Sequence, residues 1–238
     1  MLAPLTVAVA QPRCVALDVA TNAAAHAALV MAAATRVVVF PELSLTGYEL
    51  DAPPLAVDDE RLAPLVAACA ASGTIALAGA PVAADDGARN IGMLAVDAAG
   101  WRVAYRKMWL GPEEVAAGLA PGPAPAVLGV DGWRLGLAVC KDTGVTEHAA
   151  ATAALGIDVY VAGTVHHDTD VQVDDDRARH TARAHHVWVA TASGAGPTGG
   201  GYVRTAGRSG VWAPDGSVVV MAGPEPDEVV TTTLTAQR

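Results

Sequence analysis

A thiol, a carboxylate and an amine each follow an apolar run of this sequence, and together they could form one reactive site. Cys140 comes directly after the apolar residues 135–139 and before the turn-forming residues 141–144, and a helical pattern follows. The order strand, sharp turn, helix lifts a side chain out of a sheet, and α/β hydrolytic enzymes present a nucleophile in this way. Glu42 and Lys107 stand at the ends of two further apolar runs, so we expect them beside Cys140.

Cys140 alone is a weak indication of a nucleophile, because a single cysteine in apolar surroundings is more often a small core residue. Cys69, on the apolar side of a helical pattern, and Cys14, in a loop without reactive neighbours, are interpreted as residues of that kind. A single glutamate or lysine after a strand is likewise most often a surface residue. The joint pattern favours a reactive site, because a thiol needs a nearby base or cation to attack well.

The size and charge of the chain limit the classes of protein to consider. Its 238 residues suffice for one core and predict a single domain over residues 1–238. The formal net charge of −10 argues against nucleic acid and anionic membranes as partners. No apolar run is long enough to span a bilayer, and residues 7–10 indicate a first strand and not a signal peptide. Three widely spaced cysteines predict no disulfide framework, so we expect a reduced, cytoplasmic protein.

Strand-like runs alternate with alanine-rich helical windows along the chain. Asp18 is suited to cap a first helix that ends near Thr35, and Gly73 ends a second helix over residues 58–72. Further helices are expected over 145–155 and 174–185, and strands over 5–10, 36–40, 74–80, 92–97, 100–105, 135–139, 158–162, 187–192, 209–212 and 217–221. This order, with hairpins among the strands, predicts a layered α/β or α+β sandwich.

Four segments carry motifs whose order and spacing can be compared with known families. They are FPELSLTGY at 40–48, YRKMWL at 105–110, LAVCKD at 137–142 and RSGVWAPDGSVV at 208–219. Together, over nearly the whole chain, they resemble the carbon-nitrogen hydrolases, the nitrilase superfamily, and its amidase-like branch in particular. The resemblance implies a one-domain α-β-β-α sandwich. It also implies a homodimer or a higher homo-oligomer, because that family pairs its sandwiches.

The resemblance further implies a role for each reactive residue. It makes Glu42 the general base, Lys107 the cation that stabilises the oxyanion, and Cys140 the nucleophile. The backbone N–H of Lys141 would be a second oxyanion donor. This chemistry is coherent, since the base can take the thiol proton and later activate water. The cation would favour the thiolate and meet the charge that develops on the substrate oxygen.

The family also has a second glutamate between the lysine and the cysteine, and two adjacent residues compete for that role here. Counting back from Pro121-Gly122, which resembles the end of this loop in the family, favours Glu114 over Glu113, although the fit requires a one-residue insertion. Both could instead be ordinary loop carboxylates. We assign Glu114 to the catalytic residues and Glu113 to the substrate side.

Departures from the family pattern concern the substrate. Lys141 stands where many relatives have an aromatic residue, and it could bind substrate. Asp142 matches the amidase-like branches, whereas true nitrilases commonly carry glutamate at this position. Carbamoyl-amino-acid hydrolases place arginines soon after the cysteine, where this chain has Thr143 and Gly144.

Tyr48, Thr164 and His166 complete the candidate substrate-binding residues. Tyr48 belongs to the first motif. Thr164 and His166 follow a predicted buried strand, where the family has substrate-contacting residues, often an aromatic one. A place in the pocket wall and a place in a surface loop are both open for His166.

Neither a metal nor a phosphate group is expected at the site. His166 and His167 beside Asp168 suggest metal ligands, but they lack the i, i+4 helical spacing of a zinc site and no cysteine pair assists them. The glycine-rich residues 194–201 lack the Lys-Ser/Thr pair and the helix start of a phosphate-binding loop. We predict a flexible loop that borders the site or contacts another subunit.

These residues predict hydrolysis of a non-peptide carbon–nitrogen bond, amide or N-carbamoyl, in a small molecule. The reaction would pass through a thioester at Cys140 and release ammonia or an amine, and it would need no metal or organic cofactor. Nitrile hydrolysis on the same residues is an alternative that Asp142 disfavours. A non-catalytic relative that binds a ligand or serves as a subunit in an assembly is the alternative outside the enzyme class.

Overall fold

Two six-stranded sheets form the centre of the computed structural model, which describes residues 2–56, 58–84 and 86–236. The first sheet has the order β14-β1-β2-β3-β4-β5 and the second the order β13-β12-β9-β8-β7-β6. The first consists of β1 (Leu5–Gln11), β2 (Val37–Val39), β3 (Ile75–Ala83), β4 (Arg89–Asp97), β5 (Gly100–Arg106) and β14 (Glu228–Leu234). The second consists of β6 (Ala126–Val130), β7 (Trp133–Val139), β8 (Val159–Thr164), β9 (Trp188–Ser193), β12 (Gly210–Trp212) and β13 (Val218–Met221).

Each sheet is built around three parallel strands, β1-β2-β3 in the first and β7-β8-β9 in the second. The strands outside these triplets pair antiparallel with their neighbours. Two short strands, β10 (Ala195–Gly196) and β11 (Thr205–Ala206), pair with each other. The candidate residues Glu42, Cys140 and His166 all follow the carboxyl ends of the central strands, where α/β sheets place their sites.

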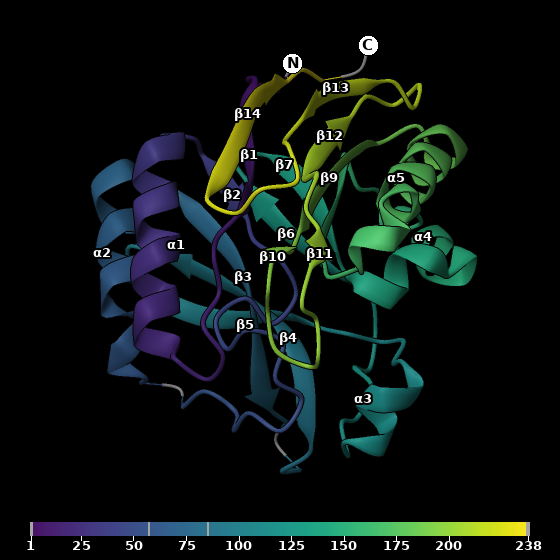
Figure 1. Cartoon of the computed structure of the whole chain (residues 1–238). Coiled ribbons are helices and arrows are strands. Elements are labelled where there is room, and N and C mark those ends of the chain that lie inside the picture. The colour runs from purple at the N-terminus through teal and green to yellow at the C-terminus, as the bar shows by residue number, and fades with distance from the viewer. Residues whose placement is uncertain (1, 57, 85, 237–238) are drawn as a thin grey trace.

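Helices cover the outer face of each sheet, so the chain forms four layers, α-β-β-α (Figure 1). The helices α1 (Val19–Ala33) and α2 (Ala63–Ser72) pack on the first sheet. The helices α4 (Thr146–Ala153) and α5 (Gln172–His185) pack on the second. A short helix, α3 (Pro112–Ala116), lies in the connection between β5 and β6. The predicted sandwich architecture is therefore confirmed.

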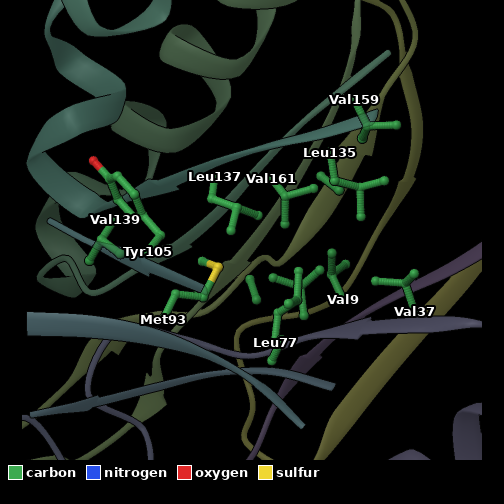
Figure 2. Packing of buried hydrophobic residues seen from close by; sticks show 14 of the residues in the cluster. Val9, Val37, Leu77, Met93, Tyr105, Leu135, Leu137, Val139, Val159 and Val161 are labelled. Atoms are coloured by element: carbon green, nitrogen blue, oxygen red, sulfur yellow. The ribbon is translucent and has the colours of Figure 1, made fainter. Parts of the chain in front are cut away.

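The main core fills the space between the two sheets (Figure 2). Val9 and Leu77 of the first sheet lie there with Leu137 and Val161 of the second. Strands buried on both faces read as continuous apolar runs, and β1 shows how the two faces differ. Its valines belong to the core between the sheets, whereas Ala8 and its other alanine pack beneath the helices.

Most of the expected elements are present, with corrected ends. Asp18 caps α1 by accepting a hydrogen bond from the Thr21 N–H, and Gly73 ends α2 in a left-handed conformation. The expected helix over 58–72 begins as a 3-10 turn at Glu60–Leu62. The helix expected from residue 145 begins at Thr146, because Val145 is extended after the 3-10 turn Cys140–Gly144. The strands β6, β10, β11 and β14 and the helix α3 were not predicted.

Within the described residues, no helix combines the length and the apolar character needed to cross a membrane.

Candidate active site

Lys107 is the centre of a buried cluster of charges. It directly follows β5, and its side chain is only 1% exposed. Its Nζ donates a hydrogen bond to Glu42 Oε1 at 2.7 Å and another to Glu114 Oε1 at 2.5 Å. A buried ammonium is tolerated only when paired and hydrogen-bonded, and two carboxylates meet that need here.

Glu42 is held in place by an unusually close approach of three backbone segments. It lies in a tight turn after β2, in which Leu43 adopts a left-handed conformation with φ of 48°. Gly79 of β3 and Gly163 of β8 flank this turn. A Cβ atom on Gly79 would lie 2.3 Å from Leu43 N, and one on Gly163 would lie 2.6 Å from Phe40 O. The two glycines therefore allow both sheets to press against the segment that carries the carboxylate.

The two adjacent glutamates have different surroundings. Glu114 is buried, and its Oε2 accepts a hydrogen bond of 2.7 Å from the Gly111 N–H at the start of α3. Its Oε1 accepts from Lys107, so one carboxylate joins the loop to the buried charge cluster. Glu113 is exposed. Glu114 therefore contacts Lys107, whereas Glu113 lies at the exposed rim of the cavity.

Cys140 sits at the turn between β7 and the following 3-10 helix. Its backbone is left-handed, with φ of 43°, a conformation that costs energy in a residue with a Cβ atom and recurs at functional turns. Its Sγ donates a weak hydrogen bond to Val165 O at 3.6 Å. The side chain is buried apart from one edge, which lines a cavity.

Burial and the neighbouring charges together determine the ionisation of the reactive groups. It raises the pKa of the Cys140 thiol, and the Glu42 carboxylate raises it further against the opposing effect of Lys107. Burial also raises the pKa of Glu42, again with Lys107 opposing. For Lys107, burial lowers the pKa, but the neighbouring Glu42, Cys140 and Glu114 outweigh burial and raise it overall. Lys107 thus favours the thiolate, as expected, but burial and Glu42 act against it and raise the pKa of the Cys140 thiol overall.

One oxygen of Glu42 is available for proton transfer. Oε1 is bonded to Lys107, whereas Oε2 is buried and has no hydrogen-bond partner among the described residues. The proximity of Glu42 and Cys140 is seen in the effect that each has on the pKa of the other. A buried acceptor without a donor is costly, and beside a thiol it is suited to act as a general base.

Asp142 anchors the loop after Lys107 to the turn that carries Cys140. The carboxylate is completely buried and accepts hydrogen bonds from the N–H groups of Val139 and Trp109, at 3.0 and 2.9 Å. The Tyr105 hydroxyl donates to it at 2.8 Å. The bonds from Trp109 and Tyr105 join two segments, and the bond from Val139 closes the Cys140 turn itself, so Asp142 has a structural role in this site.

A cavity of about 260 Å³ opens onto the cysteine. Tyr48, Glu113, Lys141 and His166, four of the five candidate substrate-binding residues, line it beside Lys107, Glu114 and Cys140. The remaining lining residues, none of which was named as a candidate from the sequence, are Gly111, Pro112, Val165 and Tyr202. Tyr202 directly follows the glycine-rich tract, which the sequence predicted to border the site.

The candidate substrate-binding residues are engaged in different ways. The Lys141 ammonium donates to Leu110 O at 2.6 Å, which ties it to the rim of the cavity. The Tyr48 hydroxyl donates to Glu114 Oε1 at 3.4 Å. Thr164 lies behind the wall, fully buried, and donates to Asp174 Oδ2 at 2.8 Å.

His166 forms part of the cavity wall together with a buried carboxylate that the sequence did not reveal. Its Nε2 lies 3.2 Å from Asp174 Oδ1, and Asp174 belongs to α5. His167, next in the chain, stacks on Tyr202 with ring centres 4.2 Å apart. The neighbouring histidines thus have separate partners, and no group of three or more His, Cys, Asp or Glu side chains in the described part of the chain is arranged to hold a metal ion.

The four-layer sandwich with its site at the ends of the central strands is the architecture of the nitrilase superfamily. Residues 6–238 match the model of the carbon-nitrogen hydrolase family, so the chain belongs to that family of hydrolases acting on carbon–nitrogen bonds.

Individual proteins are similar to the chain in sequence or in fold. A Pseudomonas protegens protein named "Hydrolase in pqqF 5'region" is 29% identical over 215 residues, which cover 87% of this chain and 75% of that protein. The fold is similar to the amidase of Nesterenkonia sp. AN1, with a TM-score of 0.84 and 25% identity over 97% of this chain and 90% of that one. It is also similar to Saccharomyces cerevisiae Nit3, a nitrilase-superfamily member, with a TM-score of 0.84 and 20% identity over 98% and 91% of the two chains.

Proposed function

We propose that the protein hydrolyses the carbon–nitrogen bond of a small, uncharged amide through a thioester at Cys140. The observation that carries this proposal is the placement of Lys107 between Glu42 and Glu114, at 2.7 and 2.5 Å, in the cavity that Cys140 lines. A thiol, a base and a cation then surround one point where a substrate carbonyl could sit.

In the first step, Cys140 Sγ attacks the carbonyl carbon while its proton passes to Glu42. The two events must be coupled, because burial and Glu42 both oppose a free thiolate. Transfer of the proton neutralises Glu42 as negative charge appears on the substrate oxygen, so the net charge of the site does not change. Lys107 and the Lys141 N–H would stabilise that oxygen, a contribution of about 3 kcal/mol for one well-placed donor.

In the second step, the tetrahedral intermediate collapses and the carbon–nitrogen bond breaks. The leaving nitrogen takes the proton from Glu42 and departs as ammonia or an amine, which leaves the acyl group on Cys140 as a thioester. Glu42, again a carboxylate, then removes a proton from water that attacks the thioester. The acid is released, and Sγ recovers its proton from Glu42.

The cavity favours small neutral acyl groups. Its volume of about 260 Å³ is modest, and Tyr48, Val165 and Tyr202 give it an apolar side. Among the described residues that line it there is no arginine, and Lys141 is already bonded to Leu110 O. The Nesterenkonia amidase, solved in complex with butyramide, offers a neutral four-carbon amide as a first substrate to try.

Thr143 and Gly144 stand where carbamoyl-amino-acid hydrolases have arginines that bind the substrate carboxylate. The guanidinium of Arg177 packs over Gly144, where a Cβ atom would approach it to 2.7 Å, but Arg177 does not line the cavity. An N-carbamoyl amino acid would therefore lack a partner for its carboxylate in this pose. This supports amides over carbamoyl amino acids.

Release of ammonia, measured over a series of substrates, tests the proposal. The series would contain acetamide, propionamide and butyramide, then an N-carbamoyl amino acid, and the matching nitriles. We expect turnover of the amides and its loss in Cys140→Ala. Turnover of the nitriles or of the carbamoyl compound alone would contradict the substrate class, and ammonia release by Cys140→Ala at the wild-type rate would contradict the mechanism.

A further inference from the structure

A buried chain of hydrogen bonds runs from the Cys140 turn into the layer of helices. The Tyr105 hydroxyl contacts Asp142 Oδ2 at 2.8 Å and His148 Nε2 at 2.9 Å. His148 Nδ1 contacts the Tyr160 hydroxyl at 2.9 Å. The four side chains come from four different elements, β5, the 3-10 turn, α4 and β8, and all are buried. None of them lines the cavity, and the proposed chemistry uses none of them.

All hydrogen bonds of this buried network can donate in one direction, from Tyr160 through His148 and Tyr105 to Asp142. The Asp142 carboxylate only accepts, so the Tyr105 hydroxyl donates its proton to it. That leaves Tyr105 as an acceptor towards His148, whose Nε2 must therefore carry the hydrogen. His148 Nδ1 then accepts from the Tyr160 hydroxyl. Burial lowers the pKa of His148, which keeps the ring in the neutral form that this arrangement requires.

This chain of hydrogen bonds ends at Asp142, whose carboxylate connects the segment after Lys107 with the turn that carries Cys140. Asp142 holds the Trp109 N–H, two residues after Lys107, and the Val139 N–H, one residue before Cys140. The Tyr105 hydroxyl also accepts a weak hydrogen bond of 3.3 Å from the Met108 N–H. In Figure 2 the Tyr105 ring lies beside Val139, with its hydroxyl directed away from the apolar cluster.

We infer that His148 is a positioning residue for the reaction: by donating to Tyr105 it orients the hydroxyl on Asp142 and so sets the spacing between Lys107 and Cys140. The Lys107 loop and the Cys140 turn follow strands of different sheets, and two direct hydrogen bonds join them: Asp142 accepts from the Trp109 N–H, and Lys141 donates to Leu110 O. Hydrogen bonds of one buried network strengthen and orient one another, so the His148–Tyr105 contact helps to fix the direction of the Asp142 carboxylate. A small displacement of reacting groups is enough to slow a reaction strongly.

The kinetic part of this inference rests on the proposed amide hydrolysis, and a matched pair of variants tests it. His148→Gln keeps an amide N–H that can donate to Tyr105, whereas His148→Met has a similar length and no donor. We expect His148→Met to lower kcat about tenfold with KM unchanged, and His148→Gln to stay within about threefold of wild type. Alkylation of Cys140 by iodoacetamide, followed by intact-mass spectrometry, should slow in the Met variant and not in the Gln variant.

Two controls separate positioning from a general loss of stability. Thr152→Val changes another buried side chain of α4, whose hydroxyl has no hydrogen-bond partner among the described residues, and it should leave kcat and alkylation unchanged. The double variant Tyr105→Phe/His148→Met should be no less active than the less active of the two single variants. Such non-additivity would show that Tyr105 and His148 act through the same hydrogen-bond network.

The inference fails if the Gln and Met variants lose kcat equally, or if both keep the wild-type kcat and alkylation rate. It also fails if a rise in KM accounts for the whole loss of kcat/KM. Losses of kcat that multiply in the double variant would overturn it as well. If the wild-type protein hydrolyses none of the amides, the proposed function fails. The alkylation rates of Cys140 in the Gln and Met variants still decide the positioning role in that case.

Discussion

Lys107 Nζ lies 2.7 Å from Glu42 Oε1, and both side chains are almost completely excluded from solvent. The two residues are 65 positions apart in the chain and reach each other from the ends of β2 and β5. Their pairing leaves Glu42 Oε2 without a partner among the described residues. The lysine thus holds the carboxylate by one oxygen, and the proposed mechanism uses the other as acceptor of the thiol proton.

Removal of the base should disable the enzyme without unfolding it. Glu42→Gln keeps the shape of the side chain and a carbonyl oxygen for Lys107, but it cannot take the thiol proton. We expect kcat/KM to fall about 10²- to 10⁴-fold, the range for loss of a general base. Steady-state kinetics would measure the loss, and a thermal melt close to that of wild type would exclude unfolding as its cause. Wild-type kcat/KM in this variant would contradict the assignment.

The adjacent glutamates provide a test with its own control. Glu114→Gln weakens the second carboxylate partner of Lys107 and the bond to the Gly111 N–H, and should reduce kcat about 10²-fold, as loss of an electrostatic contact in the site does. Glu113→Gln changes an exposed carboxylate at the rim of the cavity, which touches the substrate side and not Lys107, so it should leave kcat within about twofold, with any effect confined to KM. If the two variants have the opposite effects, the roles of the glutamates are exchanged.

The pH profile should show the burial of Glu42. The reaction needs the ionised carboxylate, and burial raises the pKa of Glu42, so protonation removes the base at a higher pH than for an ordinary glutamate. We expect kcat/KM to decline on the acid side with a midpoint above the usual value of about 4.3. The Glu113→Gln variant should keep the same midpoint. A profile that stays flat down to the ordinary range would mean that Glu42 is not the group that limits the rate.

A change at the glycine beneath the Glu42 turn should affect both stability and activity. A Cβ atom on Gly163 would lie 2.6 Å from Phe40 O and 3.0 Å from Glu42 N. Gly163→Ala should therefore lower the free energy of unfolding by about 1–3 kcal/mol, as overpacking does, and reduce kcat by moving Glu42. Gly129→Ala, in β6, places its methyl group in open space and serves as the control. Chemical denaturation of both variants would show whether only the first is destabilised.

The sequence predicts the central strands well, because they are marked locally. The runs before Glu42 and Cys140 are apolar at nearly every position, as expected for strands covered on both faces. The strand β14 was missed because its half-exposed, threonine-rich residues 228–234 alternate weakly, and its pairing with β1 lies at the opposite end of the chain. The helix α3 is only five residues long and depends on a tertiary partner, since Glu114 holds it to Lys107.

The parts of the site that depend on long-range contacts were beyond sequence reasoning. Nothing in the sequence near His166 indicates that a carboxylate from α5 would lie beside it. Lys141 has no visible partner in the sequence either, and only the fold brings Leu110 O to its ammonium. Tyr202 reaches the cavity through the packing of its loop on Tyr48, with ring centres 5.2 Å apart.

The most direct test of the central claim is to trap the acyl group on the protein. Wild-type protein mixed with an amide substrate and quenched in acid should gain the mass of one acyl group, and peptide mapping should place it on Cys140. Neither Cys69, which is fully buried, nor Cys14 lines the cavity, so neither should be acylated. Cys140→Ala should gain no mass and release no ammonia. An acyl group on another cysteine, or ammonia release by Cys140→Ala at the wild-type rate, would contradict the account.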